Sequence, residues 1–389
     1  RVDRTVLPIQ EPERPTFSEL DVRTVEAPPR FEVKAPQNAP NVVIVLIDDV
    51  GFGGPSTFGG PIQTPTLDNL AAAGLRYNNF HTTALCSPSR ASIMAGRNHH
   101  RIGLGSPSLT AMGFPGYNAI MTKDKASIAR ILKGHGYVTS WFGKNHNTPD
   151  LQVSKIGPYD QWPIGLGFDY FYGFMGGDTS QWQPGNLVRN TTYIYPYDDD
   201  PDFNLITAMA DDAIDYMKTV DALNPDQPFF IYYAPGATHA PHHVPKEWIQ
   251  KYKGKFDGGW DKLREETFER QKKLGVIPED AVLTKRPDEI PAYDDMPEEL
   301  KPILVREMET YAGFLEHTDY QIGRLIDALE DLEILDDTLI YYIIGDNGAS
   351  AEGTLNGCFN EIAVLNGMGT IETPEFLMSK IDDFGGPEA

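Results

Sequence analysis

Four short apolar runs, spread over most of the 389 residues, constrain the fold of this chain more than any other feature. They are residues 41–47 (NVVIVLI), 137–142 (YVTSWF), 228–234 (PFFIYYA) and 338–344 (TLIYYII). Runs rich in β-branched and aromatic residues are typical of strands that are buried on both faces of a parallel sheet. Because helical patterns separate the runs, the sequence predicts an α/β fold, in which a large mixed, mostly parallel sheet carries helices on both faces.

The segments between the runs alternate between helical and irregular patterns. Residues 64–74, 206–220 and 303–332 repeat apolar side chains at helical spacing, and we predict a helix over each. The last of these is long and amphipathic. The aromatic stretch at residues 167–177 is predicted to form a loop that lines a pocket.

Acidic and amide side chains follow the first and the fourth run. Asp48 and Asp49 come directly after a buried strand, where carboxylates are costly unless a cation holds them. Asp346 and Asn347 follow the fourth run, and hard divalent cations prefer carboxylate and amide oxygens. The carboxyl ends of parallel strands meet at one edge of a sheet, so these residues form a candidate metal site. Solvated turns are the alternative at both places.

Basic side chains follow the second and the third run. Lys144 and His146 alternate at the end of a strand, which places both side chains on the same side of the chain. His239 follows the third run, and histidine is a suitable proton donor to a leaving oxygen. Taken singly, each of these residues is equally consistent with an ordinary surface position.

A cysteine stands at the start of a further predicted helix, in the sequence LCSPSRASIMAGR. Ser87 is predicted to cap this helix and Pro88 to open it. Cys86 then lies at the helix N-terminus, which favours an anion, and Arg90 lies one turn further on the same face. A buried, inert thiol is the alternative. A thiolate phosphatase is excluded, because such an enzyme needs an arginine six positions after its cysteine, and here that position is Ser92.

Two sequence patterns resemble signatures of the type I sulfatases (arylsulfatases), whose fold is that of alkaline phosphatase: Cys86-x-Pro88-x-Arg90 and Gly143-Lys144-x-His146. In that family a formylglycine-generating, sulfatase-maturing enzyme oxidises the cysteine to formylglycine. The resemblance implies that residue 86 and four oxygen ligands bind one divalent cation: Asp48, Asp49, Asp346 and Asn347. Calcium is the expected cation because the ligands are oxygens, and magnesium or manganese are the alternatives.

The resemblance also implies a reaction, the hydrolysis of an aryl or other organic sulfate ester to an alcohol or phenol and sulfate. The hydrated aldehyde at residue 86 is then the nucleophile, and Arg90 and Lys144 offset charge on the sulfuryl oxygens. His239 protonates the leaving oxygen, and His146 accepts a proton when sulfate departs. Since these cations would serve the substrate, their removal is expected to change folding little. A phosphonate monoester or phosphodiester hydrolase of the same superfamily, and a non-catalytic relative with unconverted Cys86, are the alternatives.

The chain is predicted to consist of an arm and one catalytic domain. Residues 1–40 are rich in proline and charge and are expected to be extended, and residues 41–389 form the domain. Residues 245–300 resemble the insertion that covers the active site of bacterial arylsulfatases. The family continues into a smaller C-terminal subdomain and supplies a further lysine beside the sulfate. Neither is expected within these 389 residues.

Charge and cysteine content narrow the partners and the compartment. The net charge of −23 argues against nucleic acid and anionic membranes as partners, and no apolar run approaches a membrane-spanning length. Cys86 and Cys358 are the two cysteines, so the chain has no disulfide framework, and a bridge between them would consume Cys86. The proline-rich arm and the missing initiator methionine favour a periplasmic or secreted protein, with the cytoplasm as the alternative.

Overall fold

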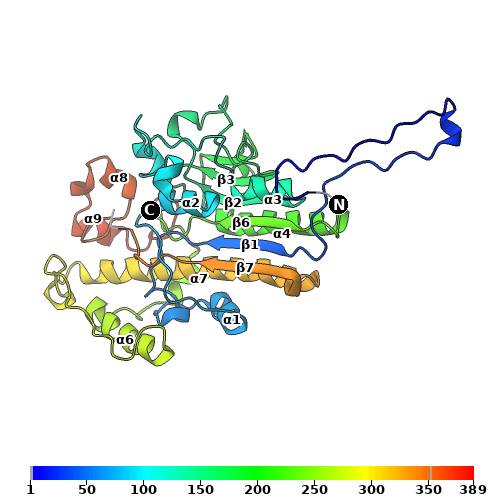
Figure 1. Ribbon diagram of the computed structural model, residues 1–389. Helices are drawn as coiled ribbons and strands as arrows, with labels where there is room; N and C mark the ends of the chain where they lie inside the picture. Colours follow the sequence, from blue (N-terminus) through cyan, green and yellow to red (C-terminus); the bar gives the residue numbers. More distant parts are fainter. Residues whose placement is uncertain (1–2, 351–352) are drawn as a thin grey trace.

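One mixed sheet forms the centre of the computed structural model, which describes residues 3–350 and 353–389 (Figure 1). Within these residues the strand order is β5-β4-β3-β2-β6-β1-β7. The parallel strands are β1 (Asn41–Leu46), β2 (Val138–Asn145), β3 (Tyr170–Met175), β6 (Phe229–Ala234) and β7 (Thr338–Ile343). The antiparallel strands are β4 (Leu187–Arg189) and β5 (Thr192–Tyr193). The predicted α/β fold with a mostly parallel sheet is confirmed.

Helices cover both faces of the sheet, because successive side chains of a strand point to opposite faces and both sets are apolar here. They are α4 (Leu205–Leu223) and α7 (Lys301–Asp331) on one face, and α2 (Cys86–Ala95) and α3 (Ile128–Gly134) on the other. Val43 and Val45 of β1 belong to the hydrophobic cluster shared with α4 and α7. Ile44 and Leu46 belong to the second cluster, which includes side chains of α2 and α3.

Two of the sequence predictions about strands are wrong. Residues 338–344 were expected to be buried on both faces, but β7 is the last strand of the described sheet, and Leu339 and Tyr341 are 45% and 47% exposed. An apolar run does not distinguish a central strand from an edge strand. Residues 167–177 were expected to form a loop, yet they contain β3, whose aromatic side chains are largely buried beside β2.

The remaining helices lie around the sheet: α1 (Pro65–Ala73), α5 (Lys246–Gln250), α6 (Gly259–Leu274), α8 (Glu361–Leu365) and α9 (Pro374–Ser379). The stretch 245–300 packs on the body, with Tyr252 and Phe256 buried in the hydrophobic cluster that includes side chains of α7. The Tyr252 hydroxyl accepts a hydrogen bond from the Gln63 N–H at 3.0 Å. That this stretch covers an active site stays a prediction.

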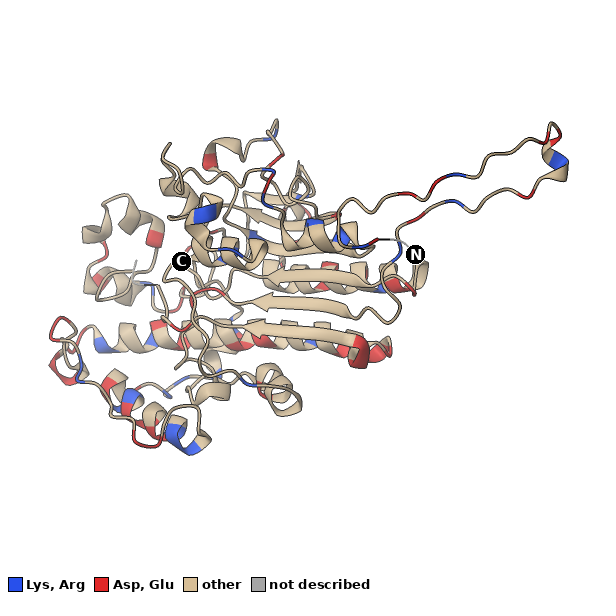
Figure 2. Ribbon diagram, viewed as in Figure 1, with Lys and Arg blue, Asp and Glu red and all other residues tan. Residues whose placement is uncertain are grey.

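The N-terminal segment runs as a long loop away from the body, on the side of the amino ends of β1 and β7 (Figure 1). Residues of both charge signs alternate along it, whereas the central strands are almost free of charge (Figure 2). From residue 3 onward, the one regular element described in this segment is a 3-10 turn at Val22–Thr24. Within the described parts of the chain, no helix combines the length and the apolar character that crossing a bilayer requires.

Candidate active site

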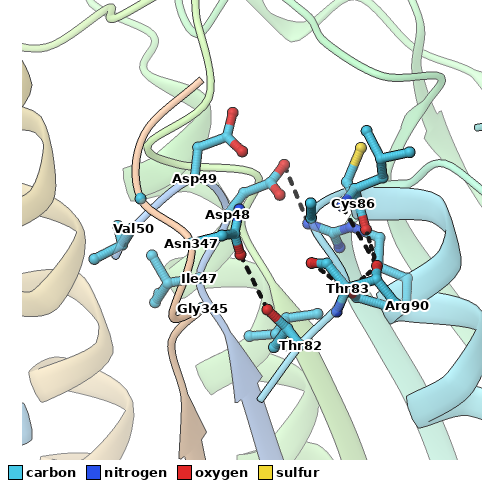
Figure 3. Close-up of a pocket in the computed structure, with 15 residues that line it drawn as sticks. Ile47, Asp48, Asp49, Val50, Thr82, Thr83, Cys86, Arg90, Gly345 and Asn347 are labelled. Carbon is cyan, nitrogen blue, oxygen red and sulfur yellow. Dashed lines mark hydrogen bonds and ion pairs between the residues drawn. The ribbon is translucent and has the colours of Figure 1, made fainter. Parts of the chain in front are cut away.

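A cavity lies at the carboxyl ends of β1 and β7, beside the N-terminus of α2 (Figure 3). Five of the residues predicted from sequence line it: Asp48, Asp49, Cys86, Arg90 and Asn347. Lys144 and His146 reach the same place from the end of β2, because the Lys144 ammonium pairs with Asp48 and the Nδ1 atom of His146 lies 3.0 Å from Cys86 Sγ. The structure therefore brings residues from four separate segments together.

The loops after β1 and β7 approach each other through glycine. A Cβ atom at Gly51 would lie 2.5 Å from the Gly348 Cα atom, so that a side chain there would push the loops apart. The Asp48–Asp49 backbone is also held by the loop after β6, since the Thr238 N–H donates to the Asp48 carbonyl at 2.7 Å. The Tyr311 hydroxyl of α7 donates to the Asp49 carbonyl at 2.7 Å. These contacts fix the position of both carboxylates.

Asp48 is buried together with two cations. Its Oδ2 atom pairs with Lys144 Nζ and lies 3.3 Å from Arg90 Nη2, and both basic side chains are almost fully buried. Burial alone would raise the pKa of Asp48, but the charges of Lys144 and Arg90 outweigh it and hold that pKa below its ordinary value. The ion pairs argue against the expectation that removing these cations changes folding little, because Lys144 and Arg90 neutralise a buried carboxylate.

Arg90 retains a donor that no described residue uses. Its Nε atom is buried and has no hydrogen-bond partner among the residues the structure describes, while its Nη1 atom donates to the Lys144 carbonyl at 3.4 Å. A buried donor without an acceptor is costly, and an anion in the cavity would supply the acceptor.

Cys86 is itself the first residue of α2, with Leu85 in the capping position. The prediction that Ser87 caps the helix is wrong, since its hydroxyl donates instead to the His146 carbonyl at 2.5 Å. Burial raises the pKa of the Cys86 thiol despite the nearby charge of Lys144. Burial, together with the charges of Lys144 and Arg90, lowers the pKa of His146 well below its ordinary value. The imidazole is therefore neutral at pH 7 and can accept a proton.

His239 stands at the edge of the same site. Its Nδ1 atom lies 2.7 Å from the Ala240 carbonyl, an acceptor, so Nδ1 carries a proton and donates it. The other ring nitrogen, Nε2, lies 3.8 Å from Asp49 Oδ2. A proton delivered to a ligand in the cavity would therefore come from Nε2.

Asp346 is the one predicted metal ligand among the four carboxylate and amide residues that does not line the cavity. Its Oδ2 atom lies 2.7 Å from Nδ1 of His81, and its Oδ1 atom accepts from the Thr82 N–H at 3.1 Å. In the described part of the chain, no three His, Cys, Asp or Glu side chains converge into a metal-binding group. Sequence reasoning assigned no role to His81 or Thr82, since neither belongs to a signature and their proximity to Asp346 arises only on folding.

The donor chemistry of the cavity nevertheless fits a hard divalent cation. Asp48, Asp49 and Asn347 offer carboxylate and amide oxygens from two adjoining loops, and Asp346 is the direct neighbour of Asn347. Thiolate or imidazole pairs, which zinc prefers, are not part of this predicted set.

Carboxylates, basic residues and histidines meet here at the carboxyl ends of parallel strands, the edge at which open α/β sheets place their ligand sites. Comparison with known proteins gives the family. The family model described as Sulfatase matches residues 40–379, and the chain belongs to the sulfatase family.

Individual relatives agree with this assignment. The chain is 33% identical to an uncharacterised sulfatase of Schizosaccharomyces pombe, over 82% of this chain and 59% of the relative. It is 29% identical to an arylsulfatase of Klebsiella aerogenes, over 81% of this chain and 68% of that enzyme. A crystal structure of a Bacteroides fragilis protein described as a sulfatase shares the fold, with a TM-score of 0.58 and 20% identity over 85% of this chain and 68% of that one. The chain thus spans about three fifths of the fission-yeast relative's length.

Proposed function

We propose that this protein hydrolyses organic sulfate esters, with a formylglycine derived from Cys86 and one divalent cation, calcium. The observation that carries the proposal is the position of Cys86, at the N-terminus of α2 and 3.0 Å from His146, in a cavity shared with Asp48, Asp49 and Asn347. A sulfatase-maturing enzyme is then a required partner, and an exported location is part of the same proposal.

In this proposal the basic residues bind the sulfate group, and the acidic and amide residues bind the cation. Arg90 and Lys144 hold the sulfuryl oxygens and offset the charge that develops on them, with the buried Nε atom of Arg90 as one free donor. Asp48, Asp49, Asp346 and Asn347 would hold the cation, which would supply further positive charge to the site. When the substrate binds, the Lys144 ammonium serves both Asp48 and the sulfate.

Two histidines move the protons. A formylglycine hydrate at residue 86 would carry two hydroxyls. One would give its proton to a carboxylate of the cation site and attack sulfur, and the bond between sulfur and the leaving oxygen would break. The second would lose its proton, so that the aldehyde forms again and sulfate leaves. His239 Nε2 protonates the departing alcohol or phenol oxygen, while Nδ1 stays bonded to the Ala240 carbonyl. His146, which is neutral because of its lowered pKa, accepts the proton of the second hydroxyl.

A cysteine nucleophile is the rival mechanism, and the site disfavours it. The thiolate is the reactive form of cysteine, yet burial raises the pKa of Cys86. A thiolate is also a poor ligand for a hard cation, whereas a diol oxygen is a good one.

The experiment is to produce the chain with and without a sulfatase-maturing enzyme and to measure residue 86 by mass spectrometry. Turnover of p-nitrophenyl sulfate should appear only in the converted protein and should vanish in Cys86→Ala. If the converted protein cleaves bis-p-nitrophenyl phosphate and not the sulfate, the phosphodiesterase alternative replaces our proposal. If Cys86 stays unconverted in the native host, the protein is a non-catalytic relative.

A further inference from the structure

The segment that leads into α2 also holds the residues that follow β7. Thr82 lies four residues before Cys86, and its side chain faces Asn347 across the cavity (Figure 3). The Thr82 hydroxyl is 3.1 Å from Asn347 Oδ1 and 3.2 Å from Asp346 Oδ1. The Thr82 N–H donates to Asp346 Oδ1 at 3.1 Å. One residue thus contacts two of the four predicted cation ligands.

Thr82 has two hydrogen-bond donors, its N–H and its hydroxyl, and each can serve one of the two ligands. A threonine hydroxyl has one proton, and the backbone N–H of Thr82 already serves Asp346. The hydroxyl proton is therefore available for Asn347 Oδ1, which fixes the orientation of the amide. His81 holds the other carboxylate oxygen of Asp346 through Nδ1 at 2.7 Å. An ionised carboxylate accepts about four hydrogen bonds, so Asp346 retains capacity for a cation.

The backbone around these contacts leaves little room for another arrangement. A Cβ atom at Gly345 would lie 3.2 Å from Asn347 Oδ1 and 3.5 Å from the Thr82 hydroxyl. The next residue, Thr83, is bonded to the helix, since its N–H donates to the Ser89 hydroxyl at 3.0 Å. The Thr82 contacts therefore connect the loop after β7 to the N-terminal turn of α2.

We propose that Thr82, assisted by His81, is a positioning residue for the cation site: it orients Asn347 and Asp346 and couples them to the helix that carries residue 86. The proposal rests on the cation-binding part of the proposed function. Residues that orient metal ligands through hydrogen bonds typically change metal affinity by about 10- to 100-fold when they are removed.

The test is calcium binding, measured by titration calorimetry on the chain with unconverted Cys86, so that no activity is needed. Thr82→Val keeps the shape and the N–H but loses the hydroxyl, and it should weaken calcium binding by about tenfold or more. Thr82→Ser restores a hydroxyl and should restore the affinity. Thr122→Val is the matched control, because it removes a threonine hydroxyl that is bonded to Asp124, and it should bind as the wild type does.

The outcomes separate the two proposals. If the wild-type chain binds no calcium with residue 86 either unconverted or converted, the cation-binding part of the proposed function fails. If the wild type binds and Thr82→Val binds equally well, the positioning role is overturned. If Thr82→Val does not fold, as shown by the loss of a cooperative unfolding transition, His81→Ala is used in its place. The His81 side chain is 74% exposed, so its removal does not disturb the core. Unchanged affinity in His81→Ala would then overturn the proposal.

Discussion

The Sγ atom of Cys86 lies 3.0 Å from Nδ1 of His146, although 60 positions separate the two residues. The contact exists because α2 begins at Cys86 and β2 ends at Asn145, so that both side chains stand at one edge of the sheet. Ser87 holds the two segments together through the His146 carbonyl. A neutral imidazole thus lies beside the predicted nucleophile before any substrate binds, which is where the proposed function needs its proton acceptor.

Replacing Cys86 should show whether it acts as the precursor of formylglycine or as a thiol nucleophile. Cys86→Ala is expected to abolish sulfate ester turnover, because it can form neither an aldehyde nor a hydrate. Cys86→Ser should give no sustained turnover, since a serine sulfate ester has no second hydroxyl with which to expel sulfate. Steady-state kinetics with an aryl sulfate, together with the mass of the peptide around residue 86, measures both. Full activity of protein shown to be wholly unconverted cysteine would contradict the mechanism.

Replacing Lys144 should affect both catalysis and stability. Lys144→Ala is expected to lower turnover by about 100-fold or more, because one of the charges that stabilise the sulfuryl oxygens is lost. It also leaves Asp48 buried with Arg90 as its closest remaining counter-charge. Breaking a buried pair costs about 3–5 kcal/mol, and urea unfolding monitored by circular dichroism measures this loss.

The double variant provides the control for this prediction. Asp48 interacts with both Lys144 and Arg90, so the loss of stability in the double variant Asp48→Asn, Lys144→Ala should differ from the sum of the two single losses, and turnover should not return. If Lys144→Ala unfolds at the same urea concentration as the wild type, the buried pair contributes nothing to folding.

The sequence predicted most of the fold because the apolar runs and the helical periodicity are local signals. The runs at 41–47, 137–142 and 228–234 correspond to β1, β2 and β6, which are neighbours within the sheet. Whether a strand has one neighbour or two is decided by topology, which is why the exposure of β7 was missed. β3 was missed because its aromatic, glycine-containing sequence lacks the β-branched pattern of the other runs.

The sequence predicted which residues belong to the candidate site, but it did not predict most of the contacts between them. The signatures identified Lys144 and Arg90 as sulfate-binding cations. They did not predict that both side chains pair with Asp48, because these pairs form only when the three side chains are buried together. The contact between Thr82 and Asn347 joins positions 265 residues apart. No spacing rule within a single sequence reports such a contact.

Asp319 should make stability depend on pH. This buried carboxylate of α7 accepts from the Thr66 and Leu67 N–H groups at the start of α1, and burial raises its pKa to about 6. Because the folded-state pKa lies above the unfolded value of 3.8, the folded state binds the proton more tightly. The stabilisation is present below pH 4 and is lost as the pH rises through 6, by about 3 kcal/mol in total.

The measurement is the free energy of unfolding between pH 4 and pH 7 for the wild type and for Asp319→Asn. The variant cannot ionise, so its unfolding free energy should lack the component that falls over this interval. Identical pH profiles for the two proteins would mean that Asp319 keeps an ordinary pKa in the folded state.

Calcium should stabilise the chain through the oxygens at the ends of β1 and β7. A ligand that binds only the folded state adds about 2.7 kcal/mol at a concentration 100 times its Kd, so calcium should raise the melting temperature, and a chelator should reverse the rise. Asp49→Asn removes an anionic oxygen that lines the cavity and should abolish most of the shift, whereas Asp280→Asn, at an exposed position, should keep it. Differential scanning calorimetry measures these shifts. A calcium-induced rise of equal size in both variants would show that the cation binds elsewhere, because only Asp49 belongs to the proposed ligand set.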